Sequence, residues 1–157
     1  MSLNSPSGLG GWLIVAAFGL ISQPIFIAIS LYTDFLPIIT EGYWQLLTTE
    51  GSEAFHQAWA PFIIFETVGN IVFLITNIIL IYLFFKKSYR FPSLYILFLA
   101  AKILFAIGLY YFMNLIPALA YASESMQFSK ELSRTVIFSI IWISYFSFSK
   151  RVKNTFV

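Results

Sequence analysis

The chain has 157 residues, of which 59% are hydrophobic and only 10% are charged. An ordinary soluble domain is about 45–50% apolar and about 25% charged, and a small domain cannot bury so much apolar surface. The composition therefore excludes a water-soluble globule, and a net charge of only +2 argues against nucleic-acid binding. The absence of cysteine excludes disulfide bonds and thiolate metal sites.

Three long apolar runs predict membrane-spanning helices. A helix needs about 20 apolar residues to cross a bilayer, and these runs are interrupted only by Glu66 and Lys102. Their continuity favours helices over the alternating strands of a β-barrel. The three runs are residues 12–32, 60–85 and 91–122.

A fourth, shorter apolar run at residues 135–148 completes the prediction. It reaches the hydrocarbon thickness if Arg134 and Lys150 extend their charged ends to the two interfaces. The fold class is therefore an all-α integral membrane protein with four transmembrane helices, forming a single membrane domain over residues 1–157. The expected helices are residues 9–33, 60–85, 91–122 and 133–149.

Basic residues are distributed unevenly over the connections between the predicted helices. One side of the membrane carries two of them, Lys130 and Arg134. By the positive-inside rule, the other side, which holds six, is cytoplasmic, and both termini lie there. These six residues are Lys86, Lys87, Arg90, Lys150, Arg151 and Lys153.

The connection between the first two helices mixes aromatic and acidic side chains. Trp44 and Trp59 are interleaved with Glu50 and Glu53. Tryptophan and tyrosine rings favour the membrane interface. We therefore expect residues 41–59 to form an interfacial helical segment on the outer surface, broken into two pieces at Gly51 and Ser52.

Polar residues at membrane depth form one predicted cluster. In the second helix, Glu66, Asn70, Phe73 and Asn77 fall on one stripe. Lys102 of the third helix lies at a similar depth. We expect its ammonium group to pair with the Glu66 carboxylate, with Asn70 as a shared partner.

The first helix contributes Gln23 to the same cluster. Gln23 shares a stripe with Ser30 and Asp34, and we expect this stripe to pack against the second helix. Pro24 follows Gln23 and predicts a kink, because proline cannot donate the helical hydrogen bond.

The cluster has two interpretations. In the structural one, the Glu66–Lys102 pair and the amides fix helix packing, and the matched charges favour this view. In the alternative, the protein is a small proton-coupled transporter in which Glu66 carries the proton and Asn70, Asn77 and Gln23 hold a solute. The sequence contains no inverted repeat of the transporter kind, which argues against the second interpretation.

Residues for other chemistry are scarce. The chain has one histidine, His56, and one aspartate, Asp34, so a hydrolytic triad is excluded. His56 follows Glu50 and Glu53 at spacings that resemble a metal site, but a solvated interfacial face explains them better. We therefore expect no catalytic residues, no metal, no cofactor and no enzymatic activity.

Three patches of the sequence resemble a known family. The segment GLGGWL at residues 8–13, the stretch from Trp59 through Glu66 to Asn70, and YFSFSKRVKNTF at residues 145–156 are similar to the bacterial domain-of-unknown-function family 2569. The resemblance implies a small four-helix protein of the bacterial inner membrane, and it implies no activity. We therefore expect an accessory or partner-binding role, with the lipid bilayer and either another membrane protein or a second copy of the chain as partners.

Overall fold

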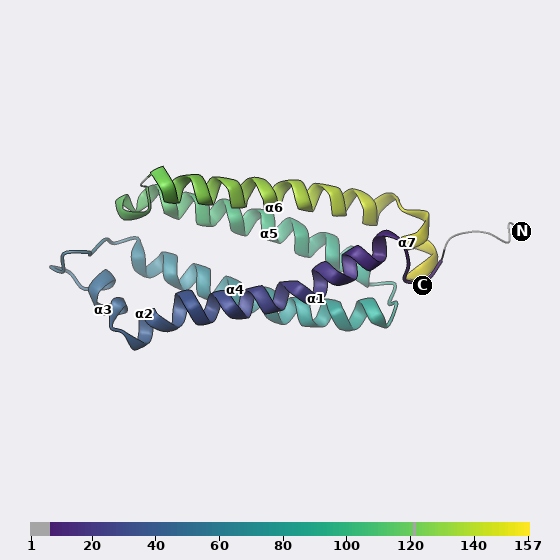
Figure 1. Ribbon diagram of the computed structural model, residues 1–157, viewed down its shortest axis with the longest axis horizontal. Coiled ribbons are helices and arrows are strands. Elements are labelled where there is room, and N and C mark those ends of the chain that lie inside the picture. The colour runs from purple at the N-terminus through teal and green to yellow at the C-terminus, as the bar shows by residue number, and fades with distance from the viewer. Residues whose placement is uncertain (1–6, 121) are drawn as a thin grey trace, which may run out of the picture.

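The computed structural model describes residues 7–120 and 122–157, and every regular element in these ranges is a helix. The long helices run side by side in two pairs (Figure 1). α1 (Trp12–Ser30) packs on α4 (Trp59–Phe85), and α5 (Phe91–Leu115) packs on α6 (Ala122–Phe148). Contacts between α4 and α5 join the two pairs.

The first helix is longer than the predicted residues 9–33. α1 passes directly into a π-helical turn, η1 (Leu31–Phe35), and then into α2 (Leu36–Thr40). The continuous helix Trp12–Thr40 has 29 residues and contains Pro24 inside α1. The prediction ends near residue 33 because Asp34 is charged, yet Asp34 and the mostly apolar residues beyond it stay helical.

The segment between the first two long helices is less helical than predicted. It contains α3 (Tyr43–Thr48), followed by turns as far as Ala58. Gly51 adopts a φ of +93°, which side-chain-bearing residues rarely adopt. The Ser52 hydroxyl donates to the Leu46 carbonyl and folds the turn back on α3. The second helical piece predicted after Ser52 is therefore wrong.

Three helices in the described ranges are long and apolar enough to cross a membrane: Trp12–Thr40, Trp59–Phe85 and Phe91–Leu115. α4 matches its predicted bounds closely. α5 ends at Leu115 instead of residue 122, because Pro117 disfavours helical geometry at Ile116 and starts the short helix η2 (Pro117–Leu119).

α6 begins about three turns before the predicted residue 133. Its 27 residues equal α4 in length. Its N-terminal half is polar, which the apolar-run criterion does not register as helix.

Two hydrophobic clusters fill the bundle. The larger one lies at the end where the described chain starts and finishes, and it joins residues of α1, α4, α5 and α6 with Val152 and Phe156. At its centre, Phe91 stacks on Phe156 at a ring-centroid distance of 4.9 Å. The smaller cluster, at the opposite end, surrounds Phe62 and Ile116.

A terminal clasp, formed by Gly8 to Gly11 and the short helix α7 (Lys150–Thr155), ties the two chain ends together. The Thr155 hydroxyl donates to the Gly8 carbonyl at 3.3 Å. The Arg151 guanidinium lies so close to Gly10 that an added Cβ there would sit 2.6 Å from Nη1. The two terminal patches that mark the family resemblance are therefore in direct contact.

Candidate functional site

The structure brings Gln23 and Asn77 together. Asn77 of α4 is fully buried, and its Nδ2 donates to Gln23 Oε1 of α1 at 2.8 Å. Asn77 Oδ1 and Ser139 Oγ on α6 are buried without a hydrogen-bond partner among the described residues. The Gln23–Asn77 contact therefore joins α1 to α4, and α6 carries a buried polar group of its own.

Glu66 and Asn70 line a small pocket between α4 and the π-helical turn. Ser30 and Asp34 line the same pocket from the first helix. Its volume is about 30 Å³, and about 10–15 Å³ suffices for one water molecule. The pocket can therefore hold water between the Glu66 carboxylate and the first helix.

Asp34 is held by two hydroxyl groups on its own helix. Ser30 Oγ donates to Oδ2 at 2.6 Å, and Thr33 Oγ1 donates to Oδ1 at 2.7 Å. Asp34 itself is exposed, whereas Glu66 is half-buried. The predicted site set omits Ser30 and Asp34, although their position on the Gln23 stripe is the signal that identifies them.

The predicted ion pair between Glu66 and Lys102 is not formed. No such pair lies within 4 Å in the described ranges; instead Lys102 Nζ lies 5.9 Å from the centroid of the Phe98 ring on its own helix. The Glu66 carboxylate has Asp34 and Glu131 as its electrostatic neighbours. Lys102 therefore does not join the pocket that contains Glu66 and Asn70.

Aromatic side chains of α4 and α5 pack together beside Lys102, which stays apart from Glu66. Phe73 of α4 contacts Phe98 and Phe105 of α5, with ring-centroid distances of 5.5 Å and 5.1 Å. Phe98 and Phe105 lie one turn before and one turn after Lys102. Phe73 lies two turns after Glu66 on the same stripe of α4, so this stripe contacts α5 through Phe73 and the first helix through the Glu66 pocket.

Among the described side chains, residues 7–120 and 126–157, no group of three or more histidine, aspartate or glutamate residues is placed to hold a metal ion. His56 uses its Nδ1 to accept the backbone N–H of Ala58 at 3.2 Å. The loop that carries Glu50 and Glu53 therefore uses its histidine for a backbone contact.

Long apolar helices around a small polar pocket define a helical membrane protein. The chain belongs to the family described as "Protein of unknown function (DUF2569)", whose model matches residues 6–157. No curated protein and no solved structure matches the chain.

Proposed function

We propose that this chain is a non-enzymatic four-span protein of the bacterial inner membrane with an accessory, partner-binding role. In this arrangement α6 is the fourth span, because it is as long as α4 and packs along α5. The six basic residues of the α4–α5 turn and α7 favour cytoplasmic termini. The aromatic residues of α3 and the following turns suit the outer interface.

The observation that carries the accessory role is the closed cytoplasmic half of the bundle. Phe84, Phe91, Tyr95 and Phe146 are all at most 3% exposed there, and their rings contact one another. A solute that reached the Glu66 pocket from outside would meet this packed aromatic cluster before the cytoplasm. A fixed aromatic cluster of this kind favours a partner-binding role over the passage of a solute through the bundle.

The transporter remains the second candidate, and the unpaired Glu66 is the observation that favours it. A permanent Lys102 partner would hold the carboxylate ionised, whereas Glu66 instead shares a pocket with Asp34 and Asn70. An ionisable group at membrane depth that faces such a pocket is a candidate proton carrier.

Proton flux separates the two functions. The purified protein is reconstituted into liposomes with a trapped pH-sensitive dye, and an inward proton gradient is applied. The accessory role predicts the same leak for wild type, Glu66→Gln and empty liposomes. A flux above that leak that disappears in Glu66→Gln would reverse the ranking and establish proton transport.

Infrared difference spectra on the same samples, recorded over about pH 5–9, add an independent readout. In a transporter, a protonated-carboxyl band should appear within that range and vanish in Glu66→Gln. If no such band appears and no proton flux is measured, the results support the accessory role.

A further inference from the structure

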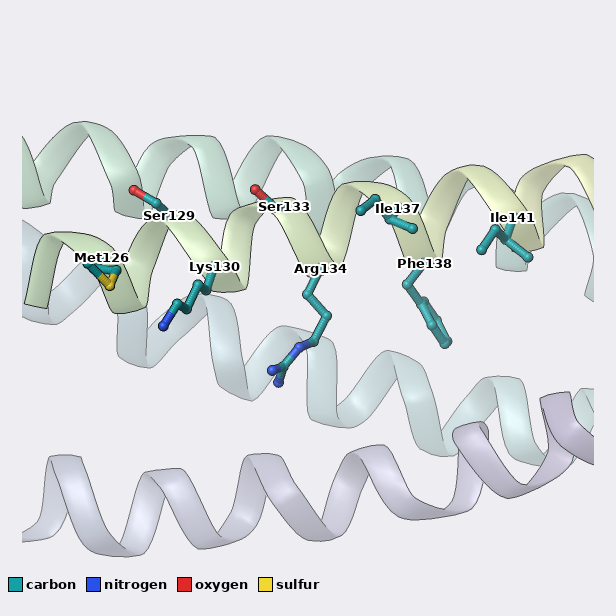
Figure 2. Close-up of a pocket in the computed structure, with 8 residues that line it drawn as sticks. All are labelled: Met126, Ser129, Lys130, Ser133, Arg134, Ile137, Phe138 and Ile141. Atoms are coloured by element: carbon teal, nitrogen blue, oxygen red, sulfur yellow. The ribbon is translucent and has the colours of Figure 1, made fainter.

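α6 carries a groove that the polar cluster does not use. Figure 2 shows Lys130, Arg134 and Phe138 projecting from one side of α6, with the ribbon of α5 behind the helix. The groove has a volume of about 690 Å³, and all its lining residues belong to α6. Its lining runs from Met126 past Lys130 and Arg134 to Ile137, Phe138 and Ile141.

We propose that this groove, which we name the α6 groove, binds one anionic phospholipid, with the phosphate at Lys130 and Arg134 and an acyl chain along Ile137 and Ile141. This binding site is separate from the accessory role and from the Glu66 pocket.

The first argument is the arrangement of charge and apolar surface along one helix face. Lys130, Arg134, Ile137 and Ile141 are spaced four, three and four residues apart, which places them on one stripe. All four side chains are exposed. Two cationic residues followed by apolar residues on one stripe complement an anionic phospholipid, in which a phosphate is followed by apolar acyl chains.

The second argument is that the two cations have no anionic partner in the described part of the protein. Neither Lys130 nor Arg134 forms a hydrogen bond or an ion pair there. Glu131 is adjacent in sequence, but it is an electrostatic neighbour of Glu66 on α4. Cations at membrane depth are costly unless paired or solvated, so a lipid phosphate provides the missing counter-charge.

The third argument is depth. Arg134 lies 14 residues before Phe148, which is about 21 Å along the helix, and Lys130 is one turn further. The hydrocarbon core is about 30 Å thick, so both side chains can reach the outer headgroup region by extending along the helix surface.

The fourth argument is the apolar surface of the neighbouring helix. A Cβ added to Gly19 of α1 would lie 4.0 Å from the tip of the Phe138 ring, so Phe138 points toward α1. Phe26, two turns further on the same face of α1, is 68% exposed. The α1 face toward which Phe138 points therefore also presents exposed apolar surface.

Acyl-brominated lipids test this proposal. Because the sequence has no cysteine, Ser133→Cys provides a unique fluorophore site in the α6 groove. In nanodiscs, brominated phosphatidylglycerol should quench this probe at a several-fold lower lipid fraction than brominated phosphatidylcholine. High salt should reduce the difference, because the attraction is partly electrostatic.

Two controls make the result specific. The double change Lys130→Gln with Arg134→Gln should remove the headgroup preference. A probe at Leu104→Cys lies on α5 at a comparable depth and is 70% exposed, so it should be quenched equally by both lipids.

Equal quenching by both lipids at Ser133→Cys would overturn the proposal, as would a preference that persists in the double variant. Absence of quenching by either lipid would also overturn it. In that case cross-linking from Ser133→Cys would determine whether α1 or a second copy covers the groove.

Discussion

At Asn77, a side-chain amide donates to Gln23 in a part of the bundle that excludes water. Interhelical hydrogen bonds in membranes contribute about 0.6 kcal/mol on average, because the alternative states also find partners. Glu66, three turns earlier on α4, has no such fixed partner. The two groups therefore respond differently to substitution.

Double-mutant cycles measure this difference. For Glu66→Gln and Lys102→Met, we expect additive changes in the free energy of unfolding, because the two side chains face different partners. For Gln23→Leu and Asn77→Leu, we expect a coupling of about 0.6 kcal/mol, with about 1.7 kcal/mol as the upper range. Reversible unfolding in mixed micelles provides both values.

The amide pair acts as the positive control for the charged pair. A coupling between Glu66 and Lys102 that equals or exceeds the amide coupling would show that the charges interact and would contradict the arrangement described here.

The sequence predicts the depth of site residues better than their direction. Residue counting correctly places Glu66 and Lys102 within the membrane-spanning helices, because the rise per residue is fixed. Their direction depends on which helix face packs against which neighbour. Phe73, on the same stripe of α4 as Glu66, contacts Phe98 and Phe105 on either side of Lys102, and no property of Glu66 alone reveals this. Gln23 and Asn77 do meet, as expected from packing the Gln23 stripe of the first helix against the polar stripe of the second.

Between α4 and α5, each helix presents a glycine to a phenylalanine of the other. A Cβ added to Gly108 would lie 2.7 Å from Phe65 Cζ, and one added to Gly69 would collide with the Phe105 ring. Small residues allow helix backbones and rings to approach closely in membranes. This reciprocal packing fixes the register that joins the two helix pairs.

Substitution of Gly69 by alanine should therefore destabilise the bundle. We expect a loss of about 1–3 kcal/mol, the usual cost of overpacking, measured by unfolding in mixed micelles. Adding Phe105→Leu should recover part of this loss. Gly19→Ala is the matched control: its nearest side-chain atom is 4.0 Å away, so higher helix propensity should leave stability unchanged or raised. An equal loss at both glycines would refute the packing argument.

Some helix boundaries can be predicted from the sequence, whereas others are not visible in its hydropathy. Pro117 already signals the end of α5 at Leu115, since the residue before proline avoids helical geometry. The early start of α6 is not visible in hydropathy, because residues such as Gln127 and Lys130 are polar yet compatible with a helix. The π-helical turn at Leu31–Phe35 contains Asp34, whose carboxylate accepts hydrogen bonds from Ser30 and Thr33, and it has no simple sequence signal.

Across the whole molecule, charge is segregated between the two ends of the bundle. The α4–α5 turn and α7 carry six basic residues and no acidic ones. The opposite end carries acidic residues that include Glu41, Glu50 and Glu53. This asymmetry is the basis of the proposed orientation, and it acts through short connections where the positive-inside rule is strongest.

Single-cysteine labelling in intact cells tests the orientation and the fourth span together. Glu53→Cys and Gln127→Cys should react with an impermeant reagent from outside, because they lie at the end opposite the chain termini. Val157→Cys, 86% exposed, should react only after permeabilisation. A reactive Val157→Cys in intact cells would refute cytoplasmic termini. A protected Gln127→Cys would instead refute a membrane-crossing α6.

The terminal clasp has a consequence for biosynthesis. Gly8 and Thr155 are separated by 147 positions, and translation proceeds at about 5–20 residues per second, so the glycine loop waits on the order of ten seconds for its partner. Until α7 leaves the ribosome, Leu13 and Phe91 lack the cover of Val152 and Phe156. The clasp therefore closes only after α7 has been synthesised, and a nascent chain interrupted before α7 leaves an open bundle end for cellular quality control to recognise.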